Sequence, residues 1–201
     1  MTPDALPSPP GPVGAPASVA TFNVLFVCTG NLCRSATAEA LAQRELQRRP
    51  RAPLRFISAG THAVEGNPAA SRSVTAAAAR SANLERHHAR ELTRRRVRAA
   101  DLILCMAADH RPYVLALDRS AAKRTFLLAA FTRAVSQWAW LARSPAELVG
   151  MAAEHIRELP GDEIDDPLGR PTAAYAACAE RLDGLVTTLV GALVKSLQTI
   201  P

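Results

Sequence analysis

Short apolar runs alternate along the chain with longer segments that have the composition of helices. Strands are predicted where β-branched, aromatic or alternately apolar residues cluster, at 24–27, 54–58, 101–106 and, more weakly, 123–128. Helices are predicted where good helix formers dominate or apolar residues recur at helical spacing, from 35 onward, at 69–81, 84–98 and 109–117, and twice within 131–157.

A last amphipathic helix is predicted after a loop over 159–171. Its apolar residues recur at helical spacing, which is typical of a helix packed on a core: Tyr175, Cys178, Leu182, Leu185, Leu189 and Leu193. We expect this helix and the predicted 84–98 helix to pack on opposite faces of the sheet.

Strands that alternate with helices predict an open parallel sheet, because parallel strands must be joined by crossovers. The predicted fold class is α/β: a single domain with a four-stranded parallel sheet and helices on both faces, Rossmann-like in arrangement. This domain is expected over 21–201, after a disordered tail rich in proline and alanine over 1–20. Sites in such sheets lie at the carboxyl ends of the strands. The loops 28–35 and 59–68 and the loop after Met106 should therefore converge.

The loop after the first strand carries the candidate chemistry. Cys28 ends the strand, and Arg34 and Ser35 begin a helix after Thr-Gly-Asn-Leu-Cys. Backbone N–H groups converge in such a loop and the helix N-terminus adds partial positive charge, which together make an anion site. The same field would hold the Cys28 thiol as a thiolate. The Arg34 guanidinium is suited to bind a phosphate-like dianion. The pattern predicts a thiolate nucleophile facing a bound oxyanion.

Charge and cysteine content exclude some classes of protein. The 201 residues include 24 basic and 18 acidic ones, a net charge of +6, but aromatic residues make up only 4%. Stacking platforms for bases are scarce, so we expect attraction for anionic substrates and no nucleic acid partner. The chain start lacks the features of a signal peptide, and the apolar run 184–194 is too short to span a bilayer. We expect a cytoplasmic protein whose four cysteines form no secreted framework.

Hydrolysis of an aryl phosphoester needs a general acid, because a phenolate is a poor leaving group at neutral pH. Asp166 is the best candidate: it lies on a loop, and Pro167 restricts its backbone to extended conformations. By itself, the acidic loop around Asp166 is equally consistent with an ordinary exposed surface.

Several segments together resemble the low-molecular-weight protein tyrosine phosphatase family, over most of 22–190. They are the loop 27–35, the turn 58–61, the segment 87–90, the strand 101–106 and the Asp166-Pro167 pair. The resemblance implies the type I phosphotyrosine phosphatase fold. It also implies a cysteine phosphatase that forms a phosphocysteine intermediate and uses no metal or other cofactor. The expected partner is a phosphotyrosine-containing protein or a small phosphoester, and the oligomeric state stays open.

The resemblance also implies roles for individual residues. Cys28 is the expected nucleophile, Arg34 binds phosphate and Asp166 is the general acid. Ser35 donates to the thiolate, Asn31 adopts a left-handed conformation that asparagine tolerates, and His87 joins a supporting hydrogen-bond network. The whole phosphate-binding loop comprises Thr29, Gly30, Asn31, Leu32, Cys33, Arg34 and Ser35.

Some positions depart from the family pattern. Ala36 stands where proline is usual after the serine, and Ala107 stands where an acid usually follows the third strand. Val64 and Leu168 occupy places that are often aromatic and wall the substrate pocket. Residues 129–160 are also longer than usual. The predicted pocket walls are aliphatic, which leaves the identity of the leaving group open.

Two other functions and one redox property remain open on the sequence. An arsenate reductase would need a resolving cysteine after the third strand, whereas Cys105 is predicted inside that strand. A non-catalytic oxyanion-binding protein would not need Asp166. Cys28 and Cys33 lie at the two ends of one tight loop, so we predict a protective disulfide between them after oxidation.

Overall fold

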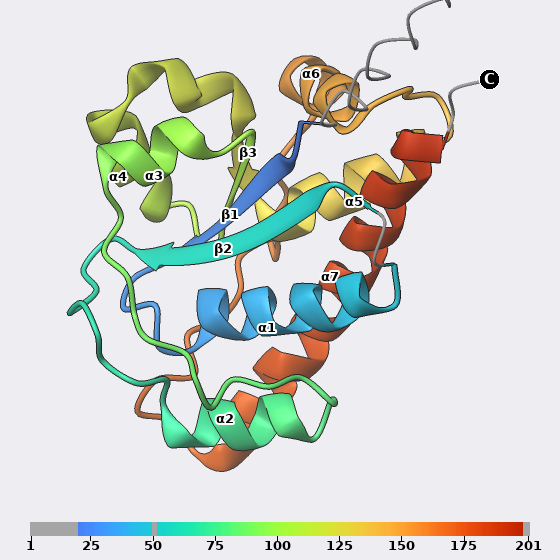
Figure 1. Cartoon of the computed structure of the whole chain (residues 1–201). Coiled ribbons are helices and arrows are strands. Elements are labelled where there is room, and N and C mark those ends of the chain that lie inside the picture. Colours follow the sequence, from blue (N-terminus) through green and yellow to red (C-terminus); the bar gives the residue numbers. More distant parts are fainter. Residues whose placement is uncertain (1–19, 50–51, 199–201) are drawn as a thin grey trace, which may run out of the picture.

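Four parallel strands form one sheet at the centre of the protein (Figure 1). The computed structural model describes residues 20–49 and 52–198, so all but the last residue of the predicted 1–20 tail lies outside the described residues. The strands are β1 (Phe22–Cys28), β2 (Leu54–Gly60), β3 (Leu102–Cys105) and β4 (Thr125–Leu127), in the order β2-β1-β3-β4. The predicted four-stranded parallel sheet is confirmed.

Strand β1 is buried on both faces, which explains its unbroken apolar sequence. Val24 and Phe26 belong to the core on one face of the sheet, and Leu25 and Val27 belong to the core on the other. All four side chains are inaccessible to solvent. Because β1 is a central strand with a filled layer on each side, the loop that leaves its carboxyl end starts from a fixed position.

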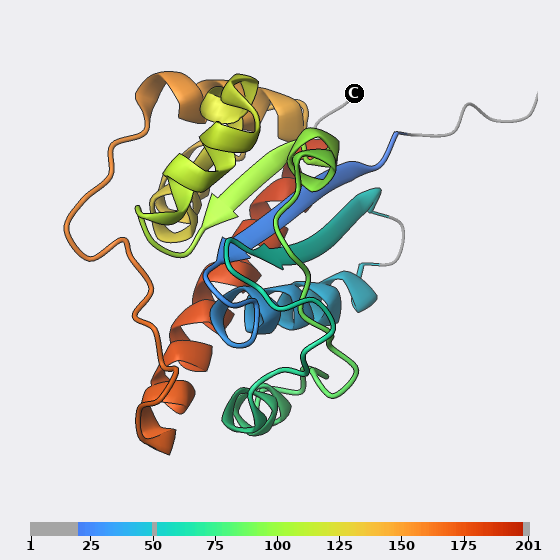
Figure 2. The same cartoon turned by 90° about the vertical axis from the view of Figure 1, so that its left-hand side faces the viewer.

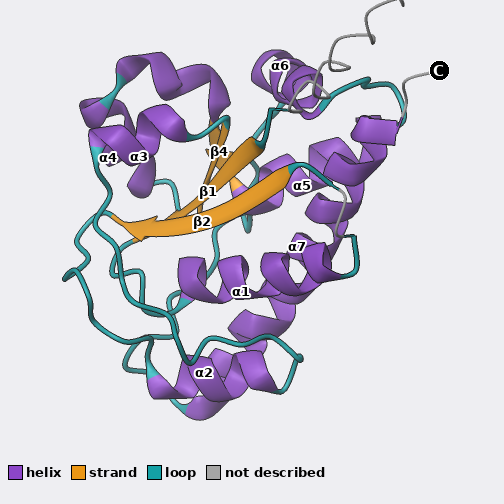
Figure 3. Ribbon diagram, in the orientation of Figure 1, coloured by secondary structure: helices purple, strands orange, loops and turns teal. Residues whose placement is uncertain are grey.

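Helices cover both faces of the sheet (Figure 3). One layer contains α1 (Arg34–Gln47), α5 (Leu128–Trp138) and α7 (Thr172–Gln198), with α2 (Ser71–Ala78) packed outside α1 and α7. The other layer contains α3 (Arg94–Ala99), α4 (His110–Leu117) and the 3₁₀ helix η1 (Arg119–Arg124). Helix α6 (Pro145–His155) packs on α5, α7 and η1.

The prediction of a helix over 84–98 is wrong for most of its length. Only 94–99 is helical, as α3, and the preceding residues form an extended segment. The backbone of that segment pairs with other loops: Gly60 donates to the carbonyl of Arg90, and Leu92 donates to the carbonyl of Gly60. These tertiary hydrogen bonds take the place of helical ones. The predicted placement of α3 and α7 on opposite faces is confirmed.

Other predicted elements shift at their ends. The helix predicted over 69–81 is α2 and ends at 78, before a turn in which Ser81 has a φ of 56°. The two helices predicted within 131–157 are α5 and α6. The last helix is longer than its predicted stripe, and the stripe faces the core: Tyr175, Leu182, Leu189 and Leu193 are buried, while Cys178 and Leu185 are half-buried.

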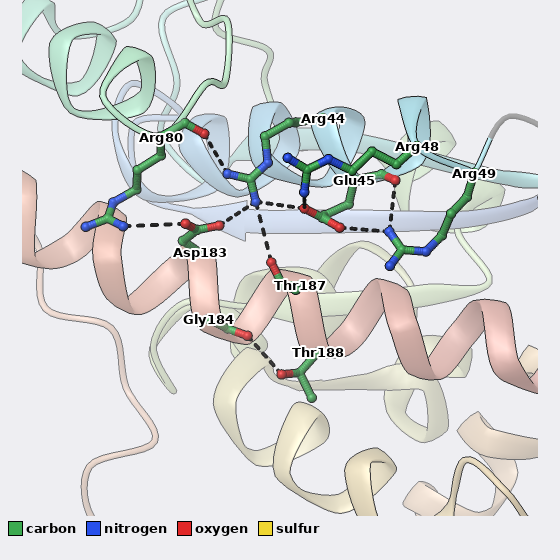
Figure 4. Close-up of polar contacts among 9 residues, drawn as sticks. All are labelled: Arg44, Glu45, Arg48, Arg49, Arg80, Asp183, Gly184, Thr187 and Thr188. Atoms are coloured by element: carbon green, nitrogen blue, oxygen red, sulfur yellow. Dashed lines mark hydrogen bonds and ion pairs between the residues drawn. The ribbon is translucent and has the colours of Figure 1, made fainter.

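An ion-pair cluster ties α1 to α7 and to the end of α2 (Figure 4). Arg44 of α1 donates to Asp183 of α7 at 2.5 Å and to the carbonyl of Arg80 at 2.6 Å. Arg44 also pairs with Glu45, whose side chain is buried and accepts from Arg49 at 2.7 Å. Each buried carboxylate oxygen has a cationic partner, and these ion pairs offset the free-energy cost of burying the charges. It holds the helix that follows the loop 28–35 in one position.

Candidate active site

The loop 28–35 lies at the carboxyl edge of the sheet, which faces the viewer in Figure 2. Two further loops pack against it. In the loop after β2, Thr61 and His62 donate their backbone N–H groups to the carbonyls of Cys28 and Thr29, at 2.9 Å each. Directly after the loop that follows β3, His110 at the start of α4 contacts the side chain of Thr29. The predicted convergence of three loops is confirmed.

Gly60 is the residue that allows this close approach. A Cβ atom at position 60 would lie 2.5 Å from the carbonyl oxygen of Thr29 and 2.8 Å from the backbone nitrogen of Asn31. These atoms belong to the backbone of the loop 28–35 and have no flexible end that could turn away. Glycine at this position therefore lets β2 support the loop from directly below.

Cys28 is buried, and within the described part of the chain its sulfur has one side-chain hydrogen-bond partner. The Sγ atom is 2.9 Å from the hydroxyl of Ser35. That hydroxyl already accepts a hydrogen bond from the side-chain amide of Asn31 at 2.8 Å, so its own proton can go to an acceptor. The two acceptors in reach are the sulfur and the carbonyl of Ala59 at 3.5 Å, and the sulfur is the nearer one. The arrangement suits a thiolate, because the nearest hydroxyl can act as a donor to it.

Asn31 holds the loop in shape through four hydrogen bonds. Its φ of 53° confirms the predicted left-handed conformation. Its amide nitrogen donates to Ser35 and Ser58 at 2.8 Å each, and its side-chain oxygen accepts from the backbone N–H of Arg90 at 2.8 Å. Its backbone carbonyl accepts from Nε2 of His87 at 2.8 Å. Every polar atom of the buried side chain is thus satisfied, which offsets the cost of the unusual backbone.

Burial lowers the pKa of His87 below the usual value for histidine. The ring is therefore neutral near pH 7, and the proton on Nε2 is the one donated to Asn31. This contact is the one expected of a residue that supports the loop from behind.

Arg34 and Asp166 meet although 132 positions separate them in the sequence. The guanidinium of Arg34 donates through Nη2 to the carboxylate of Asp166 at 2.5 Å and through Nη1 to the carbonyl of Ile164 at 3.2 Å. Its Nε atom is buried and has no hydrogen-bond partner among the described residues. The Asp166 side chain is 41% exposed, so it lies at the mouth of the site while Arg34 lies inside.

A second layer of polar residues behind the loop was not predicted. Glu39 of α1 is 7% exposed, accepts from Ser58 at 2.5 Å and forms an ion pair with Arg90. Ser58 in turn contacts Asn31. The available signal was an acidic side chain in the otherwise alanine-rich start of α1, on the face that also carries Ser35. A carboxylate among alanines does not by itself indicate burial, because glutamate is also a good helix former on exposed faces.

The rest of the predicted loop lies as follows. Gly30 and Leu32 are partly exposed at the mouth, and Cys33 is 5% exposed, with burial raising its pKa to about 11. Cys28 and Cys33 are free thiols, so the disulfide between them remains a prediction.

The loops around the site and the nearby helix α4 carry exposed side chains, some predicted and some not. Val64 is 66% exposed and Leu168 is 54% exposed. Sequence analysis missed an aromatic pair beside the same loops: His62 and Tyr113 meet edge to face with ring centroids 4.8 Å apart. Tyr113 lies on α4, 51 positions after His62, so the two rings meet only because the fold brings their segments together.

Two further observations concern the described part of the chain. No helix within 20–49 or 52–198 combines the length and apolar character needed to cross a bilayer. Over the same residues, no three histidine, cysteine, aspartate or glutamate side chains gather closely enough to hold a metal ion.

Comparisons with known proteins agree with this arrangement of loops. The family model for low molecular weight phosphotyrosine protein phosphatase matches residues 23–159, so the chain belongs to that family. A relative is the low molecular weight protein-tyrosine-phosphatase Wzb of Escherichia coli K12, 43% identical over 88 residues, which are 44% of this chain and 56% of Wzb. The chain thus spans about half the length of such curated relatives.

Longer alignments are found with other relatives. The protein-arginine-phosphatase of Geobacillus stearothermophilus is 27% identical over 178 residues, covering 89% of this chain and 97% of that protein. Its solved structure as YwlE arginine phosphatase has a TM-score of 0.69 at 25% identity, covering 90% and 98% of the two chains. A low molecular weight protein tyrosine phosphatase from T. tengcongensis has a TM-score of 0.68 at 28% identity, covering 85% and 99%.

Proposed function

We propose that this protein is a metal-independent cysteine phosphatase that hydrolyses phosphotyrosine through a phosphocysteine intermediate. The observation that carries the proposal is the pairing of two features at one loop. A buried cysteine has a hydroxyl neighbour whose proton is available for its sulfur. The buried guanidinium of Arg34, near the other end of the same loop, keeps an Nε–H without a partner among the described residues. Together they offer a nucleophile and a charged donor to the same oxyanion.

In the first step, the Cys28 thiolate attacks phosphorus while the bond from phosphorus to the phenolic oxygen breaks. The proton of Asp166 passes to that oxygen, and tyrosine leaves as a neutral phenol. Arg34 and the backbone N–H groups of the loop stabilise the charge on the phosphoryl oxygens, which is the task that a metal performs in other phosphatases. Asp166 occupies Nη2 of Arg34 in the structure, so a phosphoryl group that binds this atom as well as Nε would displace the carboxylate from it.

In the second step, water attacks the phosphocysteine. Asp166, now a carboxylate, takes a proton from the water as the new oxygen–phosphorus bond forms. The sulfur–phosphorus bond breaks, inorganic phosphate leaves and the thiolate returns. The hydroxyl of Ser35, 2.9 Å from the sulfur, stabilises that thiolate as a leaving group.

An aryl leaving group, in a protein or a small phosphoester, fits the rim of the site best. Exposed side chains on the surrounding loops and on α4 include the aliphatic Val64 and Leu168 and the His62–Tyr113 pair. Apolar and aromatic surfaces suit a phenyl ring, which needs no hydrogen-bonding partner around its edge. Relatives named as protein-tyrosine-phosphatases support the same substrate class.

Phosphoarginine is a second candidate substrate, favoured by the alignment with the arginine phosphatase over 89% of this chain. A guanidinium group carries several N–H donors that need acceptors in the bound state. Val64 and Leu168 offer no such acceptor, whereas the exposed carboxylates of Asp109 and Asp166 do. The two substrates therefore need to be compared directly.

Two other functions fit less well. Arsenate reduction would need a reactive resolving thiol after the third strand, but Cys105 is fully buried inside β3 and burial raises its pKa to about 12. A protein that only binds an oxyanion would not need a carboxylate such as Asp166 paired with the arginine that binds it. Four free thiols suit a reducing compartment, which supports a cytoplasmic location.

The test compares turnover of a phosphotyrosine peptide and a phosphoarginine peptide by the wild type in the presence of a chelator. We expect hydrolysis of phosphotyrosine at the higher kcat/KM and complete loss in Cys28→Ser. Faster turnover of the phosphoarginine peptide would identify phosphoarginine, and not phosphotyrosine, as the preferred substrate. Full activity in Cys28→Ser would overturn the mechanism.

A further inference from the structure

A threonine–histidine pair lies beside the catalytic arginine and has no role in the mechanism above. Thr29 directly follows Cys28, and His110 is the first residue of α4, after β3. His110 is 1% exposed, and its Nε2 atom is 3.1 Å from the hydroxyl of Thr29. Because the ring is buried, both of its nitrogen atoms need hydrogen-bond partners.

The tautomer of His110 is fixed by its second nitrogen. Nδ1 accepts a hydrogen bond from the backbone N–H of Ala107 at 3.0 Å, so in the neutral ring the proton is on Nε2. Burial lowers the pKa of His110 and favours that neutral ring. The carboxylate of Asp109 is 3.6 Å from Nε2, beyond hydrogen-bond distance, and its side chain is 78% exposed. Nε2 therefore donates to Thr29.

The Thr29 hydroxyl also accepts from Nη2 of Arg34 at 3.3 Å. A hydroxyl has two acceptor sites and one proton. Both acceptor sites are thus used, by His110 and Arg34, and the proton must point away from these donors. Among the described residues no acceptor for that proton is found. The same Nη2 of Arg34 holds Asp166, so the hydroxyl borders the space that a phosphoryl group would take from that carboxylate.

We propose that the Thr29 hydroxyl donates a hydrogen bond to a phosphoryl oxygen, and that His110 is the positioning residue that directs it there. The inference rests on the proposed phosphatase function and adds a side-chain donor to the backbone cradle. A hydroxyl that can both donate and accept would otherwise rotate freely. With two donors aimed at its oxygen, it can act only as a donor to the anion, which is the arrangement that stabilises developing negative charge.

Two pairs of variants separate this role from a structural one. Thr29→Val removes the hydroxyl at nearly constant shape, and Thr29→Ser retains it. In His110→Gln the amide can reach the position of Nε2 and donate to Thr29. In His110→Asn the shorter side chain can accept from the backbone N–H of Ala107, as Nδ1 does, but it cannot reach Thr29. His155→Asn, on the exposed surface of α6, is the matched control.

The measurements are steady-state turnover of a phosphotyrosine peptide and calorimetric affinity for orthovanadate, with thermal melts to establish folding. We expect Thr29→Val to lower kcat by roughly 10-fold to 100-fold with little change in KM, and to weaken vanadate binding by about 10-fold. Thr29→Ser and His110→Gln should stay within a few-fold of wild type. His110→Asn should resemble Thr29→Val, and the double variant of these two should be no worse than either.

The opposite order of the histidine variants would overturn the role of His110. If His110→Asn is active and His110→Gln is not, the ring serves only to bind the backbone of Ala107. Unchanged kcat and unchanged vanadate affinity in Thr29→Val would overturn the donor role. If the wild type hydrolyses no phosphoester, the proposed function fails, and the vanadate affinities still decide whether Thr29 binds the oxyanion.

Discussion

Replacing Gly60 by alanine tests how β2 supports the nucleophile loop. A methyl group at this position would lie 2.5 Å from the carbonyl oxygen of Thr29, roughly 1 Å inside van der Waals contact. It would also lie 2.8 Å from the backbone nitrogen of Asn31, so rotation of a side chain cannot relieve the clash. Either the loop or the end of β2 must move. The catalytic groups on the loop then move with it.

The size of the effect follows from that displacement. Overpacking of this kind costs about 1–3 kcal/mol of folding free energy. For a domain of this size, that lowers Tm by about 2–12 °C. Misplacing catalytic groups by about 1 Å costs on the order of 100-fold in rate. We therefore expect Gly60→Ala to remain folded at 25 °C while kcat falls by about 10-fold to 100-fold.

The assay combines thermal melts with turnover of a phosphotyrosine peptide. The control is Gly184→Ala in α7, where an added Cβ meets no atom within 4 Å. Because alanine is favoured over glycine in a helix, this control should gain about 0.5–1 kcal/mol and keep its activity. Wild-type Tm and kcat in Gly60→Ala would refute the reasoning, since the loop would then tolerate the methyl group without moving.

Three further predictions concern the acid, the core and redox control. Asp166→Asn should lower kcat on a phosphotyrosine peptide by about 10²–10⁴-fold, and far less on an aryl phosphate with an acidic phenol; equal losses would argue against acid catalysis. Leu189→Asp should cost at least about 3 kcal/mol in a denaturant titration, because it buries an unpaired charge, whereas the exposed Leu159→Asp should be near neutral; equal midpoints would contradict burial of the stripe. Peroxide should inactivate the wild type reversibly by a bridge between Cys28 and Cys33, and Cys33→Ser should recover poorly after dithiol treatment. Because the pKa of Cys33 is raised to about 11, its thiolate fraction and hence the protected fraction should increase with pH; full recovery of the variant would assign Cys33 to packing alone.

The sheet could be predicted because its central strand is apolar on both faces. Val24 and Leu25 point to opposite cores, so no alternation interrupts the run. The nucleophile loop could be predicted for a related reason: a strand, a short polar turn and a strong helix former follow one another without a gap. Both inferences depend on local sequence alone.

The extended segment before α3 could not be predicted in this way. The backbones of Arg90 and Leu92 pair with Gly60, and nothing in the local sequence indicates that pairing. The same holds for Glu39 and His110, whose roles depend on side chains brought together from different elements. Local patterns specify the elements, while the polar contacts behind the loop exist only once the sheet has formed.

The central claim is that Cys28 becomes phosphorylated during turnover. Wild type and Cys28→Ala would be mixed with a phosphotyrosine peptide, quenched in acid within milliseconds and analysed by intact mass and peptide mapping. We predict one phosphoryl group on Cys28 in the wild type, formed no more slowly than the steady-state rate, and neither phosphoryl enzyme nor turnover in Cys28→Ala. Turnover in Cys28→Ala, or a phosphoryl group on another residue of the wild type, would contradict the account.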